Sequence, residues 1–205
     1  ACNESGEPIY ALEGSVFIGG AVIQWLRDEL KIIKSAEETN AIANSIESTD
    51  GVYIVPAFSG LGAPYWNMES RGIITGITRG TNRKHIVRAA LESIAFQVND
   101  LLECLKKDLN TTLTELKVDG GATQNDFLMQ FQSNISNINI LKPNNVELTA
   151  LGAALLSGIG SGYWENIKLI SEKQKVNKTY YVEINDSKRE NILKKWSDSI
   201  KKCIS

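Results

Sequence analysis

The sequence is short of the residues that build disulfide frameworks and metal sites. Its 205 residues include three cysteines and a single histidine. Cys2, Cys104 and Cys203 are far apart, and their odd number and wide spacing match neither a zinc site nor a redox pair. We therefore expect reduced thiols in a cytosolic protein, with Cys104 as a small core residue of a helix.

Long apolar runs and an excess of one charge are also missing. No stretch is apolar over the roughly 20 residues that a membrane-spanning helix needs, and the first residues lack the pattern of a signal peptide. A formal net charge of -2 argues against nucleic-acid binding, which requires a clustered basic face. Lys173, Lys175 and Lys178 form a loose basic patch, for which a solvated face is the favoured interpretation. The first residue is not Met, which suggests a processed product or an excised piece.

Patterns of strand and helix alternate along the chain, as is typical of an α/β domain. Compact or alternating apolar runs predict strands at 8–14, 52–56, 72–77, 116–118, 139–143 and 180–184. Helical spacing of apolar residues predicts helices at about 21–33, 85–108, 127–136, 147–158 and 187–203. The Ala-rich stretch 35–50 is either a second short helix or a surface connection. Residues 58–66 mix glycine, proline and aromatics and should form no regular element.

Apolar positions at steps of three and four should face the core. In the first helix these are Val22, Leu26, Leu30 and Ile33, in the longest helix Val87, Leu91, Ile94, Val98, Leu101 and Leu105, and in the last helix Ile192, Trp196 and Ile200. His85, near the start of the longest helix, should cap it or lie on the surface. Glycine costs about 1 kcal/mol against alanine inside a helix, so Gly152 and Gly158 indicate close backbone packing or a nearby ligand. Tyr65 and Trp66 either plug their loop, which residue type favours, or form a binding wall.

The stretch 116–127 reads as a short strand, a glycine turn and the start of a helix. Gly120 and Gly121 permit positive φ and remove side chains that would hold a ligand away. Asn125 and Asp126 could cap the helix that follows. Free N–H groups at such a turn suit a phosphate or another anion. By itself, Asp-Gly-Gly is more often a tight turn that binds nothing.

Several segments, in order and at matching spacing, resemble the FGGY family of carbohydrate kinases. They lie at 11–14, 23–28, 56–66, 118–122, 127–133 and 149–154. A further signature is Gly-x-Ile-x-Gly-Ile at 72–77 followed by His-Ile-x-x-Ala-Ala-Leu-Glu at 85–92. The resemblance extends from near residue 1 to about 170. Within the family, Gly-Leu-Gly-Ala-Pro-Tyr-Trp at 60–66 favours the glycerol kinase branch over xylulose and gluconate kinases.

The resemblance implies an actin–hexokinase architecture, with two ribonuclease-H-like domains and a cleft between them. Residues 1–205 would be the second, ATP-binding domain, incomplete at its N-terminal edge, with a core at about 8–170 and a terminal strand and helix at about 179–203. The implied reaction transfers the γ-phosphoryl group of ATP to glycerol with Mg²⁺, in a cytoplasmic homodimer or homotetramer. The catalytic base and the glycerol site would lie upstream, so no catalytic residue or metal ligand is expected here.

Four residues match family positions that contact the nucleotide: Gly20, Gln24, Gly121 and Asn125. The resemblance places Gly121 near the α-phosphate and Asn125 near the adenine, and Asp119 should hold the backbone of the glycine turn. We expect this chain alone to be inactive and to bind nucleotide weakly or not at all. The alternatives are another sugar kinase of the family, a non-catalytic ATP-binding module, and a structural domain without nucleotide binding.

Overall fold

The computed structural model describes residues 7–145, 147–165 and 176–205. The helices are α1 (Ala21–Asp28), α2 (Glu38–Asn44), α3 (Arg83–Leu109), α4 (Asp126–Ser136), α5 (Leu148–Gly160) and α7 (Asp186–Ile204). A 3₁₀ turn, η1 (Gly121–Gln124), precedes α4. The strands are β1 (Tyr53–Val55), β2 (Ile73–Thr75), β3 (Glu115–Lys117), β4 (Asn139–Pro143) and β5 (Val176–Tyr180). The alternation of strands and helices confirms the predicted α/β class.

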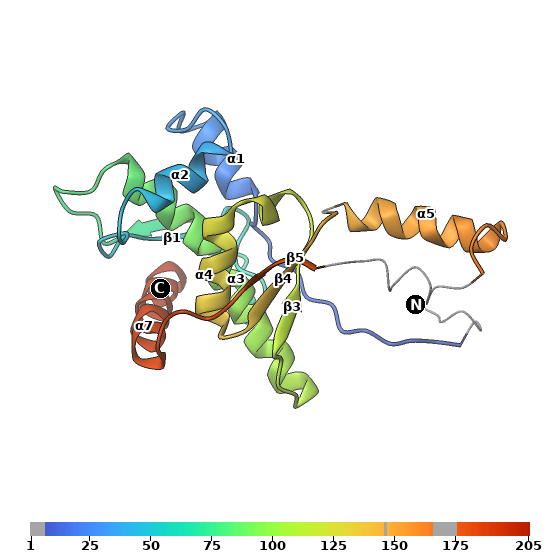
Figure 1. Cartoon of the computed structure of the whole chain (residues 1–205). Helices are drawn as coiled ribbons and strands as arrows, with labels where there is room; N and C mark the ends of the chain where they lie inside the picture. The colour runs from blue at the N-terminus through green and yellow to red at the C-terminus, as the bar shows by residue number, and fades with distance from the viewer. Residues whose placement is uncertain (1–6, 146, 166–175) are drawn as a thin grey trace.

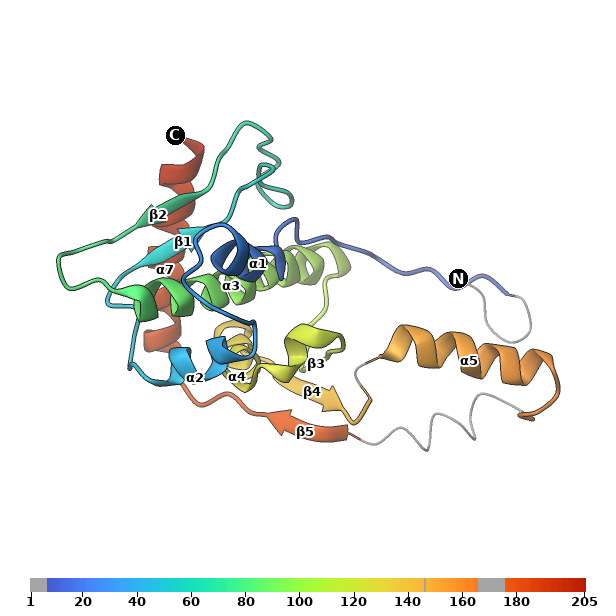
Figure 2. The same ribbon diagram turned by 90° about the horizontal axis from the view of Figure 1, so that it is seen from above.

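The strands form two small sheets around a central helix. β1 pairs antiparallel with β2, while β3, β4 and β5 form a second sheet in that order, parallel between β3 and β4 and antiparallel between β4 and β5. α3 runs through the middle and contacts α1, α2, α4 and β1 (Figures 1 and 2). α7 closes the far side of β1. We call α1–α4, α7 and the two sheets the main body.

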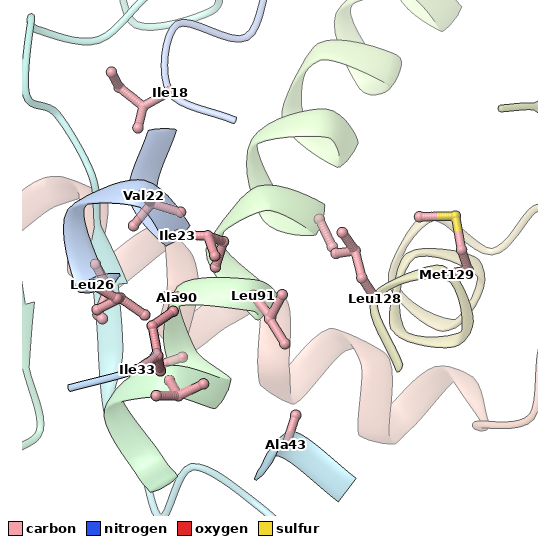
Figure 3. Packing of buried hydrophobic residues seen from close by; sticks show 14 of the residues in the cluster. Ile18, Val22, Ile23, Leu26, Ile33, Ala43, Ala90, Leu91, Leu128 and Met129 are labelled. Atoms are coloured by element: carbon pink, nitrogen blue, oxygen red, sulfur yellow. The ribbon is translucent and has the colours of Figure 1, made fainter. Parts of the chain in front are cut away.

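Two apolar clusters hold the main body together. In the larger one, Val22 and Leu26 of α1 face Ala90 and Leu91 of α3, with Leu128 of α4 beyond them (Figure 3). The second joins β1, α3, α4 and α7, and its buried aromatic members are Tyr53, Phe96 and Trp196, with Phe131 of α4 packed against them. The rings of Phe96 and Trp196 stack at 4.9 Å with an interplanar angle of 14°. Burying each large apolar side chain contributes about 1.5–3 kcal/mol, so these clusters fix how the helices meet.

The predicted burial of helix faces is partly wrong. α1 ends at Asp28, and Leu30 is 41% exposed, whereas Ile33 is buried. Lys31 has a φ of 54°, so the chain turns sharply there and helical spacing no longer predicts which residues are buried.

In α3 the predicted residues Ile94, Val98, Leu101 and Leu105 are only half-buried. The buried set includes Ala90, Ala95, Phe96 and Leu102, because α3 is contacted on several sides rather than along one stripe. On α7, Trp196 and Ile200 are buried and Ile192 packs beside them, as predicted.

Two predicted strands are displaced or absent. Residues 9–14 form no strand, and Pro8 makes only an isolated bridge. Ile9 and Tyr10 are 50% and 91% exposed, so this segment has no sheet to join in the part of the chain that the structure describes. The last strand ends at Tyr180 instead of beginning there. It runs antiparallel to β4, with Tyr180 opposite Ile140 and Val176 opposite Pro143, so the paired residues precede Tyr180. The stretch 35–50 contains the short helix α2, one of its two predicted forms.

α5 has nearly its predicted bounds, but it does not pack against the main body as expected. It extends away from the main body, and none of its residues is buried (Figures 1 and 2). A Cβ at Gly152 would meet nothing within 4 Å, so of the two alternatives close backbone packing is wrong at this position, and a nearby ligand stays a prediction. At Gly158 it would lie 2.3 Å from the Trp164 ring, and the prediction is confirmed at that position.

The irregular segment 58–66 is confirmed and contains a cis Ala63–Pro64 bond. The Tyr65 hydroxyl donates to Asp100 Oδ2 at 2.7 Å, so Tyr65 closes the loop, whereas Trp66 is 72% exposed. His85 caps α3 as predicted, since its Nδ1 accepts from Asn82 N in a capping box.

The remaining predictions concern cysteines, the basic patch and membrane spans. Cys104 and Cys203 are free and half-buried, while Cys2 lies outside the described residues. Lys178 pairs with Asp126 at 2.9 Å, and Lys173 and Lys175 lie outside the described residues. Among the described helices, none has the length and apolar character needed to cross a membrane.

Candidate functional site

A cleft of about 260 Å³ lies where α1, α2, α3 and the start of α4 meet. It is lined by Gly20, Ile23, Gln24, Arg27, Ala36, Thr39, Leu91, Ile94, Gly121, Ala122, Asn125 and Leu128. All four residues singled out from the sequence, Gly20, Gln24, Gly121 and Asn125, are in this set. The fold thus brings together two pairs of residues that are about a hundred positions apart in the chain.

The start of α1 forms one wall of the cleft. Gly20 occupies the cap position, and its carbonyl accepts from the N–H groups of Ile23 and Gln24. The N–H groups of Gly20 and Ala21 have no acceptor within the described residues. A Cβ built on Gly20 would meet nothing within 4 Å, so the backbone there is open to a ligand. Gln24 follows one helical turn later on the same face and is exposed.

The glycine turn after β3 forms the opposite wall. Gly120 has a φ of 82°, which glycine adopts readily, and the chain then makes the 3₁₀ turn η1. The direct passage from glycine turn to α-helix that the sequence suggested is therefore interrupted by η1. A Cβ at Gly121 would meet nothing within 4 Å. The N–H groups of Gly121 and Ala122 have no acceptor in the described part of the chain.

Thr123, not Asp119, holds this turn closed. The Thr123 hydroxyl donates to the Gly120 carbonyl at 2.7 Å, and the Thr123 N–H reaches the same oxygen at 3.1 Å. Asp119 is exposed and makes no hydrogen bond within the described residues. The role predicted for Asp119 was wrong because a hydroxyl two positions beyond the second glycine folds back more easily than a carboxylate that points to water.

Asn125 links two elements of the site. Its Oδ1 accepts from Leu128 N at 3.0 Å and caps α4, as the sequence predicted. Its Nδ2 donates to Thr39 Oγ1 of α2 at 3.0 Å. Thr39 is 86 positions away in the sequence, so no local pattern could have revealed it. Ala36 was missed for the same reason. Arg27 lies three residues after Gln24 on α1, so helical spacing was the signal that could have indicated it.

The floor of the cleft is apolar and its rim is polar. Ile23, Leu91 and Leu128 are buried beneath it. Arg27 is the one charged residue in the lining, and its guanidinium pairs with the exposed Asp28 at 2.7 Å, which lowers the pKa of that carboxyl. An apolar floor, two open glycines and unpaired N–H groups suit a ligand with a flat apolar part and an anionic part.

Two larger hollows, of about 550 and 540 Å³, lie on another part of the main body. Both are lined by Arg88, Phe131 and Asn134, and neither contains any of the four predicted residues. Arg88 is already committed there, because it donates to Glu92 and to the carbonyls of Ala43 and Ile46. We therefore place the candidate site in the smaller cleft.

A comparison with known families shows which family the chain belongs to. The model of the FGGY family of carbohydrate kinases, C-terminal domain, matches residues 2–161. The chain belongs to the FGGY family of carbohydrate kinases. The family resemblance and the fold class predicted from the sequence are thereby confirmed.

The FGGY relatives are longer than this chain. A glycerol kinase of Shewanella piezotolerans is 50% identical over 98% of the chain, and one of Clostridium botulinum is 51% identical over all of it. The chain spans 41% of the length of each. A crystal structure of Plasmodium falciparum glycerol kinase with ADP superposes with a TM-score of 0.83 at 37% identity, covering 91% of this chain and 37% of that one.

Proposed function

We propose that the full-length product of this gene is an ATP-dependent glycerol kinase, to which this chain contributes the nucleotide-binding side. The observation that carries the proposal is the single cleft in which Gly20, Gln24, Gly121 and Asn125 meet. Relatives named as glycerol kinases at about 50% identity support the choice of substrate. A solved relative that carries ADP supports the choice of ligand.

In this proposal the nucleotide enters with its base in the cleft and its phosphates outside. The cleft, at about 260 Å³, is smaller than the roughly 300–1,000 Å³ of pockets that enclose a whole ligand. The apolar floor would take the flat base beside Asn125. The unpaired N–H groups at Gly20 and Gly121 would then bind the nearer phosphates, with no side chain in the way. The γ-phosphate is left pointing out of this domain.

Phosphoryl transfer depends on positioning, on neutralising the phosphate charge and on a base that accepts the hydroxyl proton. The residues of this chain would supply the positioning. Mg²⁺ would travel with the phosphates of ATP and complete its coordination with residues outside the chain, as would glycerol and the base. We place the enzyme in the cytoplasm, as a homodimer or homotetramer, and the reduced state of Cys104 and Cys203 is compatible with that compartment.

The test is ADP formation by the full-length gene product, with glycerol, xylulose or gluconate as acceptor. We expect turnover with glycerol and none with the other two. Turnover with xylulose or gluconate instead would keep the nucleotide site and overturn the substrate. ATP binding with no turnover of any of these acceptors would favour the non-catalytic module, and no binding of ATP at all would favour a structural domain.

The isolated chain provides a second measurement. It contains the cleft but lacks the partners that would hold the γ-phosphate, so we expect no turnover and weak or absent ATP binding. Isothermal titration of the chain with ATP measures this. A dissociation constant in the micromolar range would show that the cleft is sufficient, and would contradict the division of labour that we propose.

A further inference from the structure

Four polar groups at the wall of the cleft are joined by three hydrogen bonds that all run in one direction. The Thr39 hydroxyl donates to the Ala36 carbonyl at 2.6 Å. The same hydroxyl oxygen accepts from Asn125 Nδ2 at 3.0 Å. Asn125 Oδ1 in turn accepts from the Leu128 N–H at 3.0 Å. Thr39 is only 1% exposed, so water does not compete with these partners.

This direction fixes which end of the Asn125 amide faces which neighbour. A hydroxyl has one proton, and that of Thr39 is given to Ala36, so toward Asn125 it can only accept. The Leu128 N–H can only donate, so it must meet the amide oxygen. If the amide were rotated by half a turn, its NH2 group would face the Leu128 N–H, donor against donor. Its oxygen would face the Thr39 hydroxyl oxygen, acceptor against acceptor. The second N–H of Asn125 then has no partner among the described residues, at the wall of the cleft that Asn125 lines.

We propose that Thr39 is a positioning residue that, together with the Leu128 N–H, holds Asn125 so that its amide presents an N–H donor, and not a carbonyl, to the ligand in the cleft. This rests on the proposed nucleotide site and adds a reason for base selectivity. A donor at this place selects a base with an acceptor ring nitrogen. Thr39 is buried and its hydroxyl is already bonded to Ala36 and Asn125, so it acts through the amide.

The test uses the full-length gene product with Thr39→Val, which keeps the shape and removes the hydroxyl, and Thr39→Ser, which keeps the hydroxyl. A hydrogen bond of ordinary strength corresponds to an effect of about 3- to 10-fold. We expect Thr39→Val to raise the KM for ATP by that factor while kcat and the KM for glycerol stay unchanged. Thr39→Ser should restore the KM for ATP. A general loss of stability would instead lower the amount of active enzyme, and so the apparent kcat, without changing the KM for ATP.

A second readout tests the donor directly. ATP analogues that lack a single ring nitrogen (1-deaza, 3-deaza and 7-deaza) are compared in the parent and in Thr39→Val. One analogue should bind about 3- to 10-fold more weakly than ATP to the parent. This difference should shrink in the variant, because the Asn125 amide is then held by the Leu128 N–H alone. Equal discrimination by both proteins, or a KM for ATP unchanged in Thr39→Val, overturns the role of Thr39. Failure of the parent to bind ATP overturns the proposed function instead.

Discussion

Gly76 follows β2 and Gly121 lies in η1 after β3. The two glycines differ in the room that a side chain would have. Gly76 has a φ of 76°, and a Cβ there would lie 1.9 Å from the Gly51 carbonyl oxygen. A Cβ at Gly121 would meet nothing within 4 Å. Since Gly51 and Gly76 flank the paired strands β1 and β2, the first glycine is required by the fold. At the second, the structure shows no folding requirement for glycine, as expected if its small size serves the ligand contact proposed above.

We predict that Gly76→Ala and Gly121→Ala separate these two roles. Gly76→Ala should lower the free energy of unfolding by about 2 kcal/mol or more, because backbone must move and the residue is held at positive φ. Gly121→Ala should change it by less than about 0.5 kcal/mol. Urea unfolding of the two variants of the chain measures both values. A large loss for Gly121→Ala would mean that the turn itself, and not a ligand, demands glycine.

Glu92 gives the molecule a pH dependence of stability. It is buried beside Arg88, whose Nε donates to Glu92 Oε1 at 2.8 Å, and its burial raises its pKa from 4.5 to about 7 despite that partner. The unfolded chain loses this proton near pH 4.5 and the folded chain near 7. The folded state therefore binds more protons between these values, and its stability falls as the pH rises through that window.

The predicted measurement is the slope of unfolding free energy against pH between 5 and 8. Glu92→Gln keeps an acceptor for Arg88 and removes the titration, so the decline contributed by Glu92 should disappear even though overall stability drops. Glu103→Gln, on the same helix in the exposed pair with Lys106, serves as the control and should leave the slope intact. A parent whose stability does not fall from pH 5 to 7 would show that Arg88 keeps Glu92 charged throughout.

At the scale of elements, α7 is held to the rest of the main body chiefly through Trp196. Its ring stacks on Phe96 of α3, and its Nε1–H donates to Asp100 Oδ2 at 2.8 Å. The Tyr65 hydroxyl donates to the same oxygen at 2.7 Å. One half-buried carboxylate thus joins α3, α7 and the irregular segment 58–66. Burial also raises the pKa of Asp100.

We predict that Trp196→Ala lowers the free energy of unfolding by about 3–5 kcal/mol, since it removes a large buried ring and leaves a cavity. Trp196→Phe keeps a ring on Phe96 but loses the donor to Asp100, and should cost about 1–3 kcal/mol. Lys195→Ala, an exposed neighbour, is the control. Thermal or urea unfolding distinguishes the three. Equal losses for the Phe and Ala variants would assign the whole effect to the hydrogen bond.

Elements whose pattern is local were predicted well, and those that depend on a distant partner were not. The bounds of α3, β4 and α7 follow from periodicity and capping within a few residues of sequence. The strand expected at 8–14 is absent because a strand needs a paired neighbour, and within the described residues only Pro8 makes an isolated bridge. In the site, the resemblance supplied Gly20, Gln24, Gly121 and Asn125, which the fold gathers at one cleft, while Thr39 needed the packing of α2 on α4 to be seen.

At the scale of the whole molecule, the apolar surface is unevenly distributed. α5 has no charged residue and buries none of its side chains, and Leu156 is 63% exposed. The N-terminal segment lies at the same end of the molecule, with Tyr10 91% and Leu12 53% exposed (Figures 1 and 2). Such a concentration of exposed apolar residues is typical of a surface that another part of a protein covers. This chain spans 41% of the length of its glycerol kinase relatives, and the rest of such a protein could cover this surface.

We therefore predict that α5 is covered in the full-length gene product and uncovered in the isolated chain. The isolated chain should bind an apolar dye and self-associate, and the double variant Leu151→Glu/Leu155→Glu should reduce both without changing its helix content. In the full-length product the same double variant should instead lower the thermal midpoint and the soluble yield, because two carboxylates would be buried without partners. Ser157→Glu, on the exposed side of α5, should have neither effect. A full-length double variant as stable as its parent would mean that α5 remains exposed to water there too.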